Sequence, residues 1–414
     1  MKKAKMWMMS LVVAMMMVSQ PAFAMDVTDN FDTIDDVVDK YIEEEKFPGA
    51  TVIVGNSNGI LFEGYYGTKQ LYDMGEELET TSPVTEKTMF DLASLTKVIA
   101  TTTSIMKLYY DGDIDLDAPV SDYLPEFANN GKEKVTIADL LTHTSGLTPW
   151  NATFFHVNNR DEMREYISEL PLEYETGTDR IYSDFSFITL GLVVEEITGM
   201  PLDEYVESTI SASLSMDHTL FTPLEKEGDF EIAATSWGNP YEYKMVDDDD
   251  FGYVVEENAE DFDGWRDYTL VGEVNDGNSY YSLGGVAGHA GLFSTGYDLA
   301  TLLQLYLNNG TLNETTLFDE ETIDLFTSQQ SEFGHGYGWE INRGGVDEGY
   351  MGKVATDNFF GHTGFTGTAV VIDKDNDLFV IMLTNKQNMG TDEDGYYSNS
   401  FVFHRDVMDA IYGE

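Results

Sequence analysis

Strand-like segments occur near both ends of this chain, and helical patterns fill most of its middle. Residues 50–54 and 60–66 read as two strands around a tight turn, and residues 368–373 and 378–384 repeat the pattern near the other end. Strands bury their apolar faces only as part of a sheet. We therefore expect an α/β (α+β) protein in which both chain ends form one antiparallel sheet, flanked by helices and interrupted by an inserted all-helical domain.

The same patterns predict where the two domains divide. The sheet domain takes residues 25–85 and 281–414, and the mainly helical domain takes residues 86–280. Acidic runs with interleaved aromatics mark an insertion near 240–265, which we interpret as a solvated loop, with a cation site as the alternative. Helical periodicity occurs at 29–46, 94–110, 136–143, 160–170, 185–198, 202–213, 297–308, 319–328 and 399–412.

The first 24 residues have the pattern of an export signal. Three lysines precede an almost wholly apolar run at 6–18, and a small-x-small motif follows at 22–24. The run is short for a membrane span, which is the alternative interpretation. We expect cleavage near Ala24 and a secreted or periplasmic, cell-envelope protein without a stable transmembrane anchor. The chain has no cysteine, so neither a disulfide nor a cysteine-linked lipid is expected.

Acidic residues outnumber basic residues, 75 to 22, which gives a formal net charge of −53. This field repels nucleic acid and anionic membranes, so we expect neither as a partner. High net charge often accompanies disorder, but 42% hydrophobic and 13% aromatic residues favour a packed globule. The acids are dispersed along the chain, and we interpret them as the solvated surface of a monomer.

The acidic surface leads to the hypothesis that the protein is adapted to a salty medium. Dissolved ions screen the repulsion between surface carboxylates, so the folded state should gain stability as salt is added. We expect the thermal unfolding midpoint to rise between low and molar salt. An unchanged or lower midpoint would contradict this hypothesis.

Ser94 and Lys97 lie three residues apart at the start of a helical pattern, so the hydroxyl and the amine can touch. A serine hydroxyl attacks carbonyls once a base takes its proton. Lysine can be that base only if its pKa falls well below about 10.4, and apolar neighbours such as Leu95 and Val98 would lower it. Backbone N–H groups at the helix start suit an oxyanion. Alone, this pair also fits a capping serine and a solvated lysine.

Two later clusters offer partners for Ser94. Tyr182 and Asp184 stand just before a helical pattern, and a nearby lysine cation would favour the tyrosinate, a strong base. His362, Thr363 and Gly364 lead into a strand and offer a ring, a hydroxyl and accessible backbone N–H groups.

The three clusters, in this order, resemble the serine β-lactamase and penicillin-binding-protein superfamily, specifically its class C-like branch of D,D-peptidases and esterases. The resemblance implies a β-lactamase/transpeptidase-like fold with no metal or cofactor. It makes Ser94 the acylated nucleophile, Lys97 its activator, and Tyr182 the group that exchanges protons with nucleophile and leaving group. It also assigns the oxyanion hole to the backbone N–H groups of Ser94 and Phe365.

By the same resemblance, Asp184, His362, Thr363 and Gly364 line the substrate cleft, but two of them depart from the family pattern. Asp184 replaces an asparagine, so it can hold the lysine ammonium but loses an amide donor. His362 replaces the lysine of a Lys-Thr-Gly strand and is mostly neutral at pH 7. We therefore expect substrate carboxylates to bind more tightly at pH 6 than at pH 8. Both changes fit a peptidase or an esterase better than a β-lactamase.

We interpret the chain as an exported serine hydrolase that works through an acyl-enzyme on a small peptide, ester or β-lactam. The favoured function is that of a penicillin-binding protein resembling D-alanyl-D-alanine carboxypeptidases. The alternatives are a carboxylesterase of the β-lactamase-related family, a β-lactamase, and a surface binding module that has kept the fold and lost turnover.

Other motifs receive structural interpretations. The Gly-x-Ser-x-Gly run at 55–59 precedes a strand, whereas a nucleophile elbow precedes a helix, so we expect a hairpin turn there. His143 and His289 are expected to satisfy local backbone groups. A metal site that joins them with His362 and acids stays open, as does a Ser-His-Asp triad that uses His362.

Overall fold

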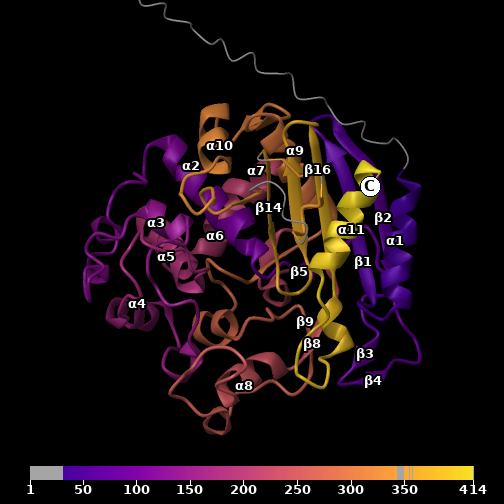
Figure 1. The fold of residues 1–414 in the computed structure, drawn as a ribbon, viewed down its shortest axis with the longest axis horizontal. Helices are drawn as coiled ribbons and strands as arrows, with labels where there is room; N and C mark the ends of the chain where they lie inside the picture. The colour runs from indigo at the N-terminus through magenta and orange to yellow at the C-terminus, as the bar shows by residue number, and fades with distance from the viewer. Residues whose placement is uncertain (1–30, 343–348, 354, 357, 414) are drawn as a thin grey trace, which may run out of the picture.

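A computed structural model describes residues 31–342, 349–353, 355–356 and 358–413. The predicted signal peptide, 1–24, lies outside these residues. The central element is a six-stranded sheet with antiparallel pairing throughout (Figure 1). Its strand order is β13 (Glu340–Ile341), β14 (Phe359–Thr363), β15 (Ala369–Asp373), β16 (Leu378–Thr384), β1 (Gly49–Asn56) and β2 (Gly59–Gly67).

The two chain ends meet at the β1–β16 pair, where Ala50 aligns with Thr384 and Gly55 with Phe379. Strand β1 is buried on both faces, so its side chains enter two cores. Val52 and Val54 pack into the core that also contains side chains of α1 (Asp32–Glu43) and α11 (Phe401–Tyr412). Ile53 points to the opposite core, on the side of α9 (Gly296–Leu307). This layering confirms the predicted sheet.

The middle of the chain contributes most of the remaining helices, which lie beside the sheet in Figure 1. They begin with a π-helix, Lys97–Thr102, that continues directly into α2 (Thr103–Asp111). The others are α3 (Ile137–Leu141), α4 (Arg160–Glu169), α5 (Asp184–Thr198), α6 (Leu202–Val206), a π-helix (Glu207–Ser211), α7 (Ala212–Leu214), α8 (Pro240–Asp247) and α10 (Glu320–Thr327).

This middle part also holds short strands, so it is not all-helical as expected. A second sheet has the order β6 (Leu220–Phe221), β10 (Leu292–Ser294), β5 (Thr88–Asp91), β7 (Glu231–Ile232). A two-stranded sheet in the middle part joins β8 (Ala234–Trp237) to β9 (Thr269–Val271). Two others lie outside it and join β3 (Tyr72–Asp73) to β4 (Glu76–Glu77) and β11 (Thr311–Leu312) to β12 (Thr315–Thr316). The division into two domains stays a prediction.

The insertion at 240–265 is wrongly predicted as a solvated loop. It begins with α8, and its apolar side chains join Trp150 and Phe154 in a small separate core. The aromatic residues between the acids supply that core, and Phe262 lies 4.9 Å from Phe154 between ring centroids. Most of the acids lie on the outside of a packed element, whereas Glu242 is drawn inward, and periodicity alone does not reveal this arrangement.

The turn at 55–59 is confirmed as a hairpin between β1 and β2.

No single helix among the described residues is long and apolar enough to cross a membrane, and the bent pair Asp184–Thr198 with Leu202–Leu214 reaches that length and composition only when its two parts are combined.

Candidate active site

Ser94 lies in a tight turn after β5, directly before the helical residues Leu95 and Thr96 that lead into the π-helix Lys97–Thr102, so it stands at the start of the helix as the sequence pattern predicts. The preceding residue, Ala93, has a φ of +46°, a conformation that costs energy for a residue with a Cβ. Its amide donates to Asp91 Oδ1 at 2.8 Å. Asp91 also accepts from the Asn275 amide at 2.6 Å, and burial raises the pKa of Asp91 to about 6.

The ammonium group of Lys97 is fully buried and uses its three protons on three partners. It lies 3.0 Å from Ser94 Oγ, 3.2 Å from the carbonyl oxygen of His289 and 2.7 Å from Asp184 Oδ1. Burial by itself lowers the pKa of Lys97, but the charge of Asp184 and the oxygen of Tyr182 outweigh burial and raise it. The expectation that Lys97 has a lowered pKa is therefore wrong: Lys97 is a cation whose hydrogen bond stabilises negative charge on Ser94.

Tyr182 comes from the loop before α5, and its hydroxyl interacts with both Lys97 and Ser94. The Lys97 nitrogen lies 4.8 Å from the centre of its ring. Burial raises the pKa of Tyr182, although the Lys97 cation lowers it in part. The expected tyrosinate is thus wrong for the resting site, where Tyr182 is a phenol that can donate a proton. The structure brings Ser94, Lys97, Tyr182 and Asp184 together.

Two histidines flank Tyr182. The ring of His143 lies 4.5 Å from the Tyr182 ring, and its Nδ1 accepts from the Ser183 amide at 3.0 Å, which holds the Tyr182 loop. Burial lowers the pKa of His143 well below its usual value. On the other side, burial lowers the pKa of His362. Its Nδ1 lies 2.8 Å from the Thr363 carbonyl. The lowered pKa moves the charged form of His362 to lower pH, and the expected difference in carboxylate binding between pH 6 and pH 8 stays a prediction.

The hairpin of β14 and β15 is hydrogen-bonded to the backbone just before Ser94. The hydroxyl of Thr366 donates to the Asp91 carbonyl at 2.7 Å, and that of Thr368 donates to the Leu92 carbonyl at 3.1 Å. Gly364 is needed at this contact, because a Cβ there would come within 2.4 Å of the Leu92 oxygen. These bonds place Phe365 against the Ser94 turn.

The amides of Ser94 and Phe365 are free to receive an oxyanion. Within the part of the chain that the structure describes, neither N–H donates to a protein acceptor. Both residues line the same two cavities, so a carbonyl bound at Ser94 would reach both donors.

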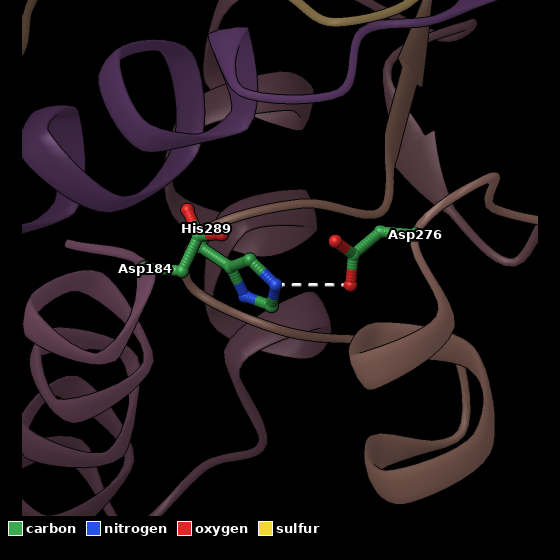
Figure 2. A group of neighbouring side chains, drawn as sticks. All are labelled: Asp184, Asp276 and His289. Atoms are coloured by element: carbon green, nitrogen blue, oxygen red, sulfur yellow. Dashed lines mark hydrogen bonds and ion pairs between the residues drawn. The ribbon is translucent and has the colours of Figure 1, made fainter. Parts of the chain in front are cut away.

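Asp184, Asp276 and His289 form a second cluster beside Lys97 (Figure 2). Their potential ligand atoms lie within 4.8 Å of one another, a spacing that a metal ion could use. In the structure His289 Nε2 lies 3.0 Å from Asp276, and Asp184 pairs with Lys97. His289 thus contacts an acid through its ring, beyond the predicted backbone role. Burial raises the pKa of Asp276, but its contacts with the His289 ring and the Ser279 amide and the nearby Lys97 ammonium outweigh burial and lower it.

Two cavities meet at Ser94, Tyr182 and Phe365. The first has a volume of about 270 Å³ and the second about 370 Å³. Part of the wall of the first cavity comes from the insertion, through Asn239, Tyr241, Glu242, Met245 and Tyr253. Our sequence reasoning missed these residues, and the aromatics between the acids were the signal.

Comparison with known proteins decides the family. The Beta-lactamase family model matches residues 34–400, nearly the whole described chain. The chain belongs to the β-lactamase family. The predicted resemblance to serine β-lactamases and penicillin-binding proteins is thereby confirmed, as is the interpretation of the chain as a serine hydrolase.

Relatives of this β-lactamase-family chain include proteins named for cell-wall chemistry. A Bacillus subtilis protein named N-acetylmuramyl-L-alanine amidase is 38% identical over 370 residues, which are 85% of this chain and 80% of the relative. A Salmonella agona protein named putative D-alanyl-D-alanine carboxypeptidase is 35% identical over 391 residues, 89% of this chain and 87% of the relative.

Solved structures show the same fold at lower identity. A penicillin-binding protein homolog from Caulobacter crescentus superposes with a TM-score of 0.68 at 18% identity, covering 93% of this chain and 98% of its own. An octameric penicillin-binding protein homologue from Pyrococcus abyssi gives 0.66 at 20% identity, with coverages of 93% and 78%.

Proposed function

We propose that this β-lactamase-family protein is an exported hydrolase that cleaves an amide bond of cell-wall peptides through an acyl-enzyme on Ser94. The observation that carries the proposal is the cluster of Ser94, Lys97, Tyr182 and Asp184 at the junction of two cavities. A carbonyl bound at Ser94 would extend its acyl part into one cavity and its leaving group into the other. The favoured bond is D-alanyl-D-alanine, in line with the Salmonella relative.

In the proposed mechanism Lys97 relays the proton of the Ser94 hydroxyl to Asp184. As Ser94 Oγ attacks, Lys97 receives its proton and passes one of its own to Asp184, 2.7 Å away. The N–H groups of Ser94 and Phe365 hold the oxyanion. Tyr182 then protonates the departing nitrogen as the C–N bond breaks, and Asp184 returns its proton through Lys97 to Tyr182. A water molecule then attacks the acyl-enzyme, the proton transfers run in the opposite direction, and the acyl group is released from Ser94.

The second candidate is the bond between muramic acid and L-alanine. It is favoured by the 38% identity to the Bacillus subtilis amidase over 85% of this chain. The first cavity suits a sugar on the acyl side, because aromatic faces such as Trp150 and Tyr253 lie beside amide and carboxyl groups in its wall.

One experiment separates these functions. Purified muropeptides with a pentapeptide stem are incubated with the protein, and the products are identified by mass spectrometry. Loss of one alanine supports the carboxypeptidase, and release of a sugar-free peptide supports the amidase. If neither occurs while a p-nitrophenyl ester or a cephalosporin is hydrolysed, the proposed bond is wrong and an esterase or a β-lactamase function replaces it.

Substitution of Asp184 by Asn should change the pH profile. Asn cannot accept the relayed proton, and loss of the carboxylate removes the largest influence that raises the pKa of Lys97, so that pKa falls. The variant would need an uncharged Lys97 as its base, so its kcat/KM should rise with pH through that lowered pKa. The measurement is kcat/KM for one ester from pH 5 to 10. A variant profile parallel to that of the wild type would contradict the relay.

A further inference from the structure

The two cavities that meet at Ser94 differ in charge. The first is lined by three carboxyl groups, those of Asp184, Glu242 and Asp276. Burial raises the pKa of Glu242 to about 8, which shows that this cavity disfavours negative charge. The second cavity is lined by one lysine, Lys386, and one acid, Glu340. The second cavity is therefore less acidic than the first, and it alone offers a substrate carboxylate a lysine in its wall.

Lys386 begins the short 3₁₀ helix Lys386–Met389 just after β16, and its side chain is almost fully buried. Its ammonium donates to the Ser398 carbonyl at 3.0 Å and lies 3.4 Å from Ser400 Oγ, which leaves one of its three donors for the cavity. No carboxylate of the described residues forms an ion pair with it. In a chain with 75 acidic residues, a buried cation without an acidic partner in the wall of the cavity that contains the nucleophile is unusual.

The other groups around the second cavity do not replace Lys386 as a receptor for an anion. His362 is neutral, because burial lowers its pKa. Glu340 also lines the cavity, but its charge acts on His362 and Tyr350 and does not perturb Lys386, whose pKa is lowered to about 8 by burial alone. The cation thus comes from the residues after β16, whereas the family pattern places it on the strand of His362.

We propose that Lys386 is a substrate-binding residue that receives a carboxylate on the leaving-group side of the scissile bond. The ammonium would bind the carboxylate with its free donor, assisted by the Thr363 hydroxyl in the same wall. The preferred substrates then carry an anionic leaving group, such as a peptide that ends in a free carboxylate next to the cleaved bond. The inference rests on the proposed function in one respect, that Ser94 is the attacking residue.

A pair of aryl esters tests this subsite without requiring a peptide substrate. The two esters share one acyl group, and their phenol leaving groups carry a meta-carboxylate or a meta-carboxamide. We expect Lys386→Met to lower kcat/KM for the carboxylate ester about 10- to 100-fold more than for the carboxamide ester, the range expected for a charge-assisted hydrogen bond. Lys386→Arg should keep most of the preference. Lys40→Met, the same charge change on exposed α1, should keep the wild-type ratio.

The wild-type protein supplies a readout that does not depend on the folding of a variant. Lys386 is charged below its pKa of about 8, so the preference for the carboxylate ester should decline as pH rises from 6.5 to 9.5. The pKa values of His362 and His404 are lowered and those of Tyr182 and Tyr397 are raised, so these neighbours keep their charge states in this range. Glu242 in the first cavity has a pKa of about 8 and gains its charge in the same range, so the decline is assigned to Lys386 when Lys386→Met abolishes it and Glu242→Gln keeps it.

Each outcome has a defined meaning. Equal losses for both esters in Lys386→Met, or a wild-type preference that is flat with pH, would overturn the role of Lys386. Undiminished hydrolysis of both esters by Ser94→Ala would overturn the proposed function instead. Failure to cleave pentapeptide muropeptides, with the ester preference intact, would refute the proposed peptide substrate and leave the Lys386 subsite standing.

Discussion

Ser94→Ala is expected to lower the turnover of every ester or peptide substrate by roughly 10⁵- to 10⁶-fold, because it removes the covalent route altogether. The loss should appear in kcat and as the absence of a covalent adduct when the protein is treated with a fluorescent penicillin. The hydroxyl of Ser94 contacts Lys97 at 3.0 Å, and its removal leaves the Lys97–Asp184 pair in place, so the variant should fold normally.

The chain offers a matched control in Ser57, the serine of the Gly-x-Ser-x-Gly run. Its hydroxyl donates to Asp377 at 2.7 Å in the β1–β2 turn, and Ser57 lines neither of the cavities that contain Ser94. Ser57→Ala should keep turnover within about twofold, as surface substitutions usually have small effects. Loss of the adduct in Ser57→Ala, or its persistence in Ser94→Ala, would show that the nucleophile is misassigned.

Tyr182→Phe should lower kcat by roughly 10²- to 10⁴-fold, the usual contribution of a general acid or base. The phenylalanine ring keeps the packing against His143, so the unfolding midpoint should change little. The size of the loss should depend on the leaving group. An amide nitrogen departs only when protonated, whereas p-nitrophenoxide departs as an anion, so the variant should lose far more activity on a peptide than on a p-nitrophenyl ester.

Tyr166→Phe is the control, because its hydroxyl accepts from Asn151 at 3.2 Å and Tyr166 lies outside both cavity walls. It should retain wild-type ratios for the two substrates. Equal losses for peptide and p-nitrophenyl ester in Tyr182→Phe would argue against proton donation to the leaving group. Unchanged rates on both would remove Tyr182 from the mechanism.

Much of the fold was predictable from local patterns. Residues of β1, β2, β15 and β16 were recognisable as short strand-like runs bounded by turn residues, and β1, β15 and β16 are buried along almost their whole length because both faces of the sheet are covered. The start of the helix at Ser94 was also predictable, but the conformation of the turn before it was not. Ala93 has a φ of +46° there, and its amide donates to Asp91 Oδ1. Such strain depends on contacts that the local sequence does not contain.

The charge states of the candidate site also depend on contacts that the local sequence does not contain. Spacing and order identified Ser94, Lys97 and Tyr182 as partners, and the structure brings them together. Their charge states were predicted wrongly, because the pKa of Lys97 depends on Asp184, 87 positions further along the chain and 2.7 Å away in space. Lys386 was not predicted for a related reason. Its proposed role depends on its burial in a cavity wall, and no sequence motif marks such a position.

Patterns among neighbouring residues were enough to predict which segments become strands, which residue types stand at the family's positions, and how acidic the chain is. The raised or lowered pKa values of the buried groups, the place of Lys386 in the wall of a cavity with Ser94, and the role of the acidic insertion as another wall of the site appear only in the folded molecule. Those properties follow from distance in space and from exclusion of water, which set the strength of every Coulomb interaction and arise only when the chain ends close around its middle.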